Sequence, residues 1–297
     1  MRDGDLEGLL SLDKPVGHTS HDMVSFVRSR LGVRRVGHSG TLDPFASGLL
    51  LLCLGRSTRL IEYLHVFPKR YEACARLGVS TSTDDPEGDV VSESDSWNAL
   101  TAGEIASTLD VFVGVVDQRP PRFSAKKVRG TTAYARSRRG EEISLPSAPV
   151  TIHSIEITGI DLPYVRFDVQ CGTGTYVRAL ARDLGEALGV GAHLTELRRV
   201  EIGPFRVEAA FTPAALPQPD QITGALIPPL EVVSHLPRLE VTHEEAARIE
   251  SGQAFELPTA PPSNDQGEHA VVFQGQLLAV AVRDGSRFKL RKVFSRE

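Results

Sequence analysis

The sequence of 297 residues predicts an α+β fold built on an antiparallel or mixed sheet, followed by a smaller β-rich domain. Segments with alternating apolar residues, typical of half-buried strands, occur at residues 70–79 and 165–171. Helical patterns with capping residues lie between them, without the regular strand-helix repeat of a parallel sheet. The tail from about residue 235 contains short apolar runs separated by glycines, which favours a compact β module.

The first third of the chain has clear local signals. Thr19 and Asp22 form an N-terminal capping pattern for a helix that Gly32 can end. A uniformly apolar run with glycine flanks predicts a buried segment, but periodicity does not choose between helix and strand. The predicted elements are a strand at residues 9–12, a helix at 20–31, this buried segment at 49–54 and a helix at 57–66.

Two further helices are predicted in the middle of the chain. Thr101 and Glu104 form a capping box, after a polar and turn-rich stretch at residues 84–98. Thr175 is predicted to cap a helix with leucines at every fourth position, which ends near Gly189.

A proline-rich and charge-poor stretch at residues 213–237 predicts a linker. We therefore expect one domain at residues 1–234 and a second at residues 235–297.

Composition limits the class of protein. With 41% hydrophobic and 24% charged residues, the chain resembles ordinary globular proteins. Its longest apolar run is far short of the ~20 residues that cross a bilayer, and its N-terminus has no signal-peptide core, so we expect a cytoplasmic protein. The three cysteines are far apart and odd in number, so we predict reduced, buried thiols without a disulfide framework or a thiolate metal site. No His and carboxylate cluster has convincing ligand spacing, so we predict no metal.

The distribution of charge points to a polyanionic partner, although the net charge is −5. Basic residues gather in acid-free runs at residues 119–139 and 23–42, and again near the C-terminus. Three such runs in an otherwise acidic chain favour a polyanionic partner. The first run contains Arg119, Arg122, Lys126, Lys127, Arg129, Arg136, Arg138 and Arg139.

One carboxylate, Asp43, lies in a small-residue loop at residues 37–48, directly before the apolar run. Three glycines in this loop permit positive φ or close backbone approach, and Pro44 pushes Asp43 toward an extended conformation. The loop can therefore be tight and specific, which makes Asp43 a candidate for chemistry. An ordinary Asp-Pro turn is the alternative interpretation.

Several separated motifs over about residues 8–210 resemble, in order, those of the TruB family of pseudouridine synthases. They are residues 12–17, the Asp43 loop, 69–71, 81–88, 118–121 with 124–127, 172–178 and 197–199. Departures from the family pattern are mild: Ser39 stands where threonine is usual, and Phe45 and Ser47 replace the commoner leucine and threonine.

The resemblance implies the pseudouridine synthase fold, with a mixed, mainly antiparallel sheet flanked by helices and a PUA-like RNA-binding domain at residues 235–297. It also implies a cofactor-free isomerase that converts the T-loop uridine at position 55 of tRNA to pseudouridine. The family's partner is the tRNA T-arm, and its members are usually monomeric.

The resemblance also assigns roles to residues of this chain. Asp43 would be the nucleophile that attacks the uracil ring or the ribose anomeric carbon, and Arg178 the cation that keeps it ionised. Tyr71 would stack on the target base. The implied substrate-binding residues are His38, Lys14, Leu197 and Tyr176, and the implied RNA-backbone contacts are Arg119, Lys126, Lys127 and Arg129.

Two other function classes stay open from the sequence. A non-catalytic tRNA-binding or tRNA-folding protein on the same scaffold would lose the aspartate, tyrosine or arginine, and all three are present. A hydrolase of glycosidic bonds would need a second carboxylate as its acid, and spacing singles out neither Asp13 nor Asp22.

Overall fold

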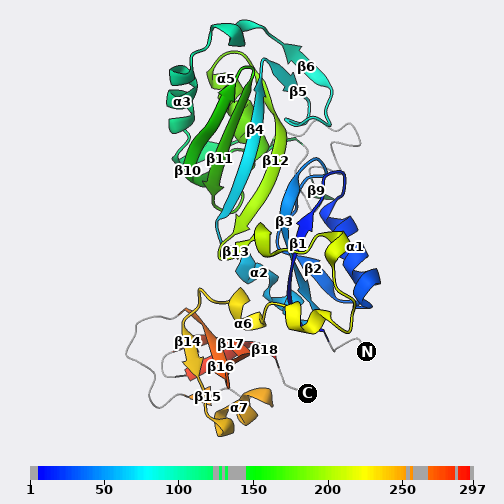
Figure 1. The fold of residues 1–297 in the computed structure, drawn as a ribbon. Helices are drawn as coiled ribbons and strands as arrows, with labels where there is room; N and C mark the ends of the chain where they lie inside the picture. The colour runs from blue at the N-terminus through cyan, green and yellow to red at the C-terminus, as the bar shows by residue number, and fades with distance from the viewer. Residues whose placement is uncertain are drawn as a thin grey trace.

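The computed structural model describes residues 6–122, 127–128, 131–132, 145–251, 255–256, 267–284 and 287–294. These residues form a nine-stranded sheet, a five-stranded sheet and two small two-stranded sheets, with helices packed around them (Figure 1). Most strand pairs are antiparallel and a few are parallel, so the predicted α+β class with a mixed, mainly antiparallel sheet is confirmed.

The nine-stranded sheet has its two halves joined at its middle. In Figure 1, β4, β10 and β11 form the upper half, and β1, β2 and β3 form the half that lies below and to the right. Strand β12 joins them: it is antiparallel to β4 but parallel to β3, at the pairs Arg198–Ser47 and Arg199–Gly48. In spatial order the strands are β1 (Gly8–Lys14), β3 (Ser47–Leu54), β12 (Ala192–Ile202), β4 (Lys69–Leu77), β11 (Tyr164–Cys171), β10 (Ala148–Asp161) and β7 (Gly114–Gln118), with β2 (Val36–His38) on β3 and β13 (Phe205–Arg206) on β12.

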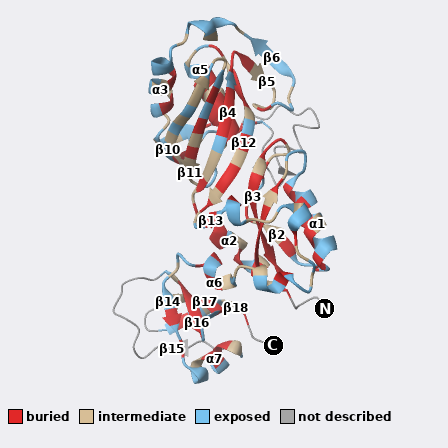
Figure 2. Ribbon diagram, in the orientation of Figure 1, coloured by how far each residue is buried: buried red, intermediate tan, exposed pale blue. Residues whose placement is uncertain are grey.

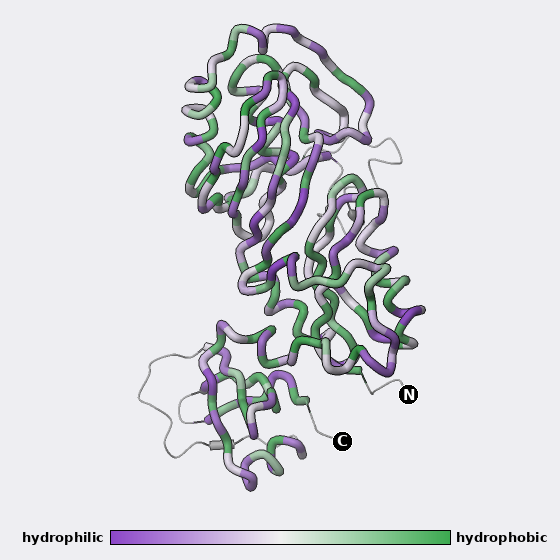
Figure 3. Tube along the Cα trace, viewed as in Figure 1, coloured by the Kyte–Doolittle hydropathy of each residue, from purple (hydrophilic) through white to green (hydrophobic). Residues whose placement is uncertain are grey.

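The apolar run at residues 49–54 is the buried strand β3. Leu49 and Leu51 face one core cluster, whereas Leu50 and Leu52 face another on the opposite side of the sheet. Because both faces are covered, the strand shows no alternation of apolar and polar residues. Figure 2 shows this strand buried along its length, and Figure 3 shows hydrophobic residues along the same part of the chain.

The helices with capping boxes form as predicted. Helix α1 (Ser20–Leu31) starts at Thr19 and ends at a left-handed Gly32, and α3 (Ala102–Asp110) starts at Thr101. Helix α5 (Val177–Ala187) packs with α3 on one face of the sheet, against Phe167 and its neighbours. The helix predicted at residues 57–66 is instead a 3-10 helix, Gly55–Leu60, followed by one α-helical turn, α2 (Ile61–Leu64).

One local prediction in the middle of the chain is wrong. Thr175 does not cap α5: the cap position is Tyr176, whose side chain makes no capping hydrogen bond. The buried Gln118 holds that position instead, since its amide accepts from the Tyr176 nitrogen (2.8 Å) and donates to the Tyr176 oxygen (3.1 Å). The turn-rich stretch at residues 84–98 contains a strand, β6 (Val90–Glu93), whose four residues are all exposed and which pairs with β5 (Val79–Thr81).

The predicted linker at residues 213–237 is also wrong, because much of it is packed against the large sheet. Leu216 and Ile222 are buried beside the β1 residues Leu10 and Leu12. Ile227 forms an isolated bridge with β1. The short elements within residues 213–237 are the 3-10 helices Pro213–Ala215 and Ile222–Ala225 and the helix α6 (Pro229–Val232). Apolar residues spaced irregularly between prolines thus enter the core one at a time, without a periodic signal.

The tail forms the compact β module that the sequence predicts. Its strands are, in spatial order, β14 (Arg238–Glu240), β16 (Glu268–Phe273), β17 (Gln276–Asp284), β18 (Arg287–Val293) and β15 (Phe255–Glu256), with α7 (His243–Glu250) beside them. Val272, Leu277 and Phe294 share a core cluster with Leu9 and Leu60 of the rest of the chain. The boundary between residues 234 and 235 stays a prediction.

Candidate active site

Asp43 lies in the loop that joins β2 to β3, and the backbone on both sides of it is fixed. The Leu42 nitrogen donates to the Ser20 hydroxyl (2.8 Å), and the Pro44 oxygen accepts from the Gly17 nitrogen (2.8 Å). Gly48 ends the loop with φ 104°, where a Cβ would lie 2.2 Å from the Arg199 carbonyl oxygen. Only glycine fits there, so the close approach predicted for this loop is confirmed at Gly48.

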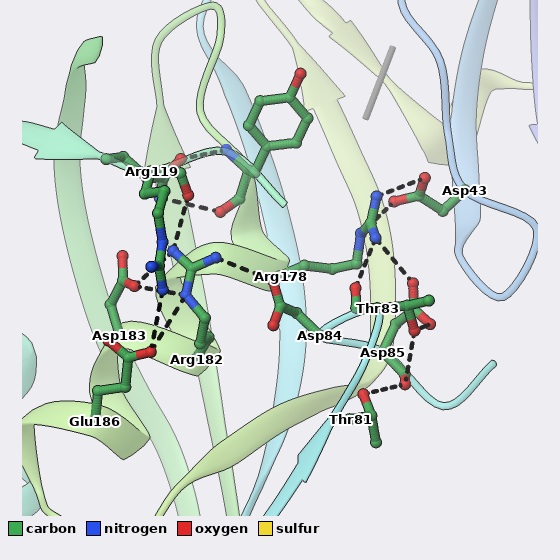
Figure 4. A network of polar contacts seen from close by, with 12 residues as sticks. Asp43, Thr81, Thr83, Asp84, Asp85, Arg119, Arg178, Arg182, Asp183 and Glu186 are labelled. Carbon is green, nitrogen blue, oxygen red and sulfur yellow. Dashed lines mark hydrogen bonds and ion pairs between the residues drawn. The ribbon is translucent and has the colours of Figure 1, made fainter. Parts of the chain in front are cut away.

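Arg178, on the first turn of α5, points directly at Asp43 (Figure 4). Its Nε lies 2.9 Å from Oδ2 of Asp43, and its second terminal nitrogen donates to Oδ1 at 3.2 Å. The arginine side chain is 4% exposed and the aspartate side chain 33%, so the pair lies at the boundary between core and solvent. The guanidinium therefore holds one face of the carboxylate and leaves the other accessible.

A second carboxylate, Asp85, holds the other side of the same guanidinium. Arg178 donates to Asp85 Oδ2 (3.0 Å) and to the Thr83 carbonyl (2.8 Å). Asp85 also accepts from the Thr83 hydroxyl and from the Glu87 nitrogen (3.0 Å). Sequence reasoning did not single out Asp85, although the acid pair before Pro86 lies inside one of the motifs.

The neighbouring Asp84 turns away from Asp85 and binds the next arginine of α5. Asp84 has a left-handed φ of 62°, and its carboxylate lies 3.0 Å from Arg182. Figure 4 shows Arg178 and Arg182, one helical turn apart, each paired with one of these two aspartates. The turn at residues 83–85 and α5 are thus connected by two ion pairs.

The charge state of Asp43 depends on two opposing effects. Burial raises the pKa of this carboxyl above its ordinary value, and the positive charge of Arg178 opposes that rise. Without the guanidinium, burial alone would favour the protonated acid, which is a poor nucleophile.

A cavity of about 120 Å³ opens beside Asp43. A cavity of about 150 Å³ holds one benzene ring, so this one has the scale of a single base. It brings together five of the predicted site residues from four separate motifs. Its lining consists of Thr41, Leu42, Asp43, Tyr71, Thr175, Tyr176, Val177, Arg178 and Leu197.

Tyr71 contributes an aromatic ring to this cavity from β4, between Val169 of β11 and Arg199 of β12. Burial raises the pKa of its phenol above the ordinary value. A neutral phenol at physiological pH is suited to stacking on a base and is a weak proton acceptor.

Comparison with known proteins identifies the family. Residues 28–177 match the model of the TruB family pseudouridylate synthase (N terminal domain), and residues 178–231 match that of the tRNA pseudouridylate synthase B C-terminal domain. The tRNA pseudouridine synthase B of Arthrobacter sp. (strain FB24) is 41% identical over 98% of this chain and 97% of its own length. The chain belongs to the TruB family. The tRNA pseudouridine synthase B of Thermobifida fusca is 49% identical over 69% of this chain and 73% of its own.

Solved structures agree with this membership in the TruB family. A Cbf5-Nop10-Gar1 complex contains a chain that is 27% identical, with a TM-score of 0.73 over 97% of this chain and 85% of that chain. An archaeal box H/ACA sRNP Nop10-Cbf5 complex gives 26% identity and a TM-score of 0.72, over 97% and 86%. The pseudouridine synthase fold implied by the sequence motifs is thereby confirmed.

His38 and Lys14, two residues that the TruB resemblance assigns to substrate binding, do not line the cavity beside Asp43. The His38 ring accepts from the Gly40 nitrogen (3.3 Å), and burial lowers its pKa, so the imidazole is neutral at pH 7. Lys14 is fully buried and donates to the Pro15 oxygen (2.9 Å) and the His18 oxygen (2.7 Å). Its direct contacts are thus with the turn that follows β1.

Burial lowers the pKa of Lys14 to about 8, from an ordinary value of 10.5. The unfolded chain keeps this proton up to about pH 10.5, whereas the folded protein loses it above about pH 8, so deprotonation favours the folded state. In the parent, this difference in pKa raises the unfolding free energy by about 1.4 kcal/mol per pH unit between pH 8 and 10. We expect Lys14→Met to lack this contribution to the slope. Urea titrations of both proteins across this range measure the difference, and parallel curves would contradict it.

The basic run at residues 119–139 is only partly described. The Arg119 side chain is 59% exposed and lies 3.3 Å from Glu186, while the Arg119 carbonyl accepts from Arg182 (2.8 Å). Lys126 and Arg129 lie outside the described residues, and the side chain of Lys127, in β8 (Lys127–Val128), does as well. Of the four predicted RNA-backbone contacts, the structure therefore places the side chain of Arg119 alone.

Other polar groups named from the sequence have structural partners. Asp13 accepts from Arg198 (2.8 Å), and Asp22 accepts from the Thr19 nitrogen at the start of α1 (2.8 Å).

The three cysteines, Cys53, Cys74 and Cys171, are buried and form no disulfide. Among the residues that the structure describes, no group of three or more His, Cys, Asp or Glu could hold a metal ion, and no helix is long and apolar enough to cross a membrane.

Proposed function

We propose that this TruB-family isomerase converts the T-loop uridine at position 55 of tRNA to pseudouridine, with Asp43 as the nucleophile. The observation that carries the proposal is the contact of Asp43 with Arg178 at the edge of a base-sized cavity that Tyr71 and Leu197 also line. Relatives named tRNA pseudouridine synthase B over nearly the whole chain support tRNA as the substrate.

The reaction is balanced within one nucleotide. The bond from the ribose anomeric carbon to uracil N1 breaks, the base turns, and the same ribose carbon bonds to uracil C5. C5 loses its proton and N1 gains one, so no oxidant, reductant or further co-reactant is consumed. Asp43 would attack either the uracil ring or the anomeric carbon, and its accessible face suits either approach.

Capture of the base follows from the residues that line the cavity. A uridine within a folded T-loop must leave its stack to reach Asp43, at a cost of a few kcal/mol. Stacking on Tyr71 and apolar contact with Leu197 would offset that cost and keep the base in place while it is detached. Tyr176, which lines the same cavity, has its backbone fixed by Gln118.

The experiment that tests this proposal is release of tritium from a T-arm stem-loop labelled at C5 of its uridines. Release of one equivalent, lost when the position-55 uridine alone is replaced by cytidine, is the expected result. No release from a correctly folded substrate would contradict the proposal and favour a tRNA-folding protein. Free uracil in the products would instead indicate a hydrolase.

The basic run at residues 119–139 would bind the T-arm through phosphate contacts, reading shape more than sequence. We expect charge reversal at Lys126 and Lys127 to weaken stem-loop binding by about tenfold or more and to lower the salt dependence by roughly one to two phosphate contacts. Filter binding at several salt concentrations measures both, with tritium release at saturating RNA as the check that Asp43 chemistry remains. Equal salt slopes for variant and parent would contradict this role.

The expectations of a monomer and of a PUA-like RNA-binding role for the tail stay predictions.

A further inference from the structure

Arg199 of β12 is a buried cation directly beneath the site, and the reaction outlined above gives it no role. The residue is 2% exposed. Its Nε donates to the Leu49 carbonyl (2.7 Å), and a terminal nitrogen donates to the Gly40 carbonyl (3.2 Å). These two carbonyls lie on either side of Asp43 in the sequence, Gly40 before it within the loop and Leu49 directly after the loop.

The backbone of Arg199 contacts the same loop. Arg199 pairs with Gly48 where β12 runs parallel to β3, and a side chain at Gly48 would collide with the Arg199 backbone. On its other edge, Arg199 is paired with Tyr71 of β4. One residue thus touches the Asp43 loop through both backbone and side chain, and it is the cross-strand neighbour of the aromatic residue in the cavity.

From these contacts we infer that Arg199 is a positioning residue, whose forked guanidinium fixes the Asp43 loop at the distance from Tyr71 and Arg178 that the reaction requires. A planar guanidinium reaches two carbonyls at fixed angles, which a lysine ammonium of similar length cannot reproduce. Displacement of a catalytic group by about 1 Å can cost on the order of a hundredfold in rate. The positive charge of Arg199 also favours the ionised form of Tyr71, against the burial that raises the pKa of that phenol.

The adjacent arginine provides a matched control. Arg198 points to the opposite face of β12, where its side chain is 37% exposed and pairs with Asp13 at 2.8 Å. Arg198 also donates to the Ser47 hydroxyl at a longer distance (3.4 Å), but Arg198→Lys leaves both hydrogen bonds to the Gly40 and Leu49 carbonyls in place.

The test compares Arg199→Lys, Arg198→Lys and the parent protein in single-turnover tritium release at saturating protein, with stem-loop affinity measured separately. We expect Arg199→Lys to lower the rate about a hundredfold with less than a threefold change in Kd, and Arg198→Lys to stay within threefold in both. A rate for Arg199→Lys within threefold of the parent would overturn the inference, as would a loss of RNA binding that accounts for the whole effect.

A second measurement does not depend on the proposed function, on which the rate experiment rests. Hydrogen exchange of the peptide covering residues 39–49 should accelerate at least tenfold in Arg199→Lys, while the peptide covering residues 70–77 stays protected. Unchanged exchange in the loop would overturn the positioning role even if the rate fell. Arg199→Gln, which keeps amide donors but no charge, replaces the lysine variant if that protein does not fold. If the parent releases no tritium but exchange of the loop still accelerates in Arg199→Lys, the proposed function is contradicted and the positioning role is supported.

Discussion

Asp43→Asn is expected to lower the rate of pseudouridine formation by at least about 10⁴-fold, because loss of a covalent nucleophile removes most of the rate enhancement of an enzyme. The amide keeps the size and shape of the carboxylate but carries no charge and is a very weak nucleophile. Because Asp43 lies at the edge of the cavity and not in the basic run, stem-loop affinity should change less than about threefold. Tritium release and filter binding measure the two effects.

Asp22→Asn is the matched control for this substitution. Asp22 has a carboxylate that caps α1 and accepts from the Thr19 nitrogen, a contact that an asparagine oxygen can replace. Its rate should stay within about twofold of the parent, with little change in stability. Equal tritium release by Asp43→Asn and the parent would show that Asp43 is not the nucleophile.

Arg178→Met is expected to have the second largest effect, on both activity and stability. It leaves the carboxylates of Asp43 and Asp85 without the cation that lies between them. Breaking a buried ion pair by removal of one partner costs about 3–5 kcal/mol, and because Asp43 is one-third exposed we expect the lower end, about 3 kcal/mol. The pKa of Asp43, which burial already raises, should rise further. We expect a rate loss of at least about 10³-fold at pH 7, with residual activity that increases as pH rises.

Arg182→Met is the control that separates the effect of Arg178→Met on the reaction rate from its effect on stability. Arg182 lies one turn further along α5 and pairs with Asp84 at 3.0 Å, but it does not line the cavity. Its loss should also destabilise the fold, while the rate per folded molecule should stay within about tenfold of the parent. Urea titration and single-turnover release provide the two measurements. Similar rates for the two methionine variants would contradict a direct role for Arg178.

The parts of the fold that the sequence predicts correctly are those governed by nearby residues. The capping boxes at Thr19 and Thr101 act within four residues, so the starts of α1 and α3 can be read from local sequence. The start of α5 cannot, because Gln118, 58 residues earlier, holds the Tyr176 backbone. The prediction of a linker at residues 213–237 fails for the same reason, because the burial of this stretch depends on β1, about 200 residues earlier in the chain.

The residues of the site divide in the same way, into those that local motifs identify and those that only the fold reveals. Motifs identify Asp43, Tyr71 and Arg178 as candidates, but only the folded chain brings Asp43 within 3.2 Å of an arginine 135 residues away. Asp85 was not singled out because an acid in a turn-rich stretch has many solvent-exposed equivalents. What distinguishes it is burial against Arg178, which no local pattern encodes.

The parallel pairing of β3 with β12 has a consequence for biosynthesis. The strongly apolar β3 ends at Leu54, whereas its partner begins at Ala192, so the ribosome must add well over a hundred residues before the pair can form. At roughly 5–20 residues per second, the Ser47–Gly48 end of β3 lacks β12 for on the order of ten seconds, whereas Leu52–Leu54 can already pair with β2. During that interval the start of β3, next to the Asp43 loop, has unpaired backbone groups, and Asp43 acquires its arginine only near the end of the wait.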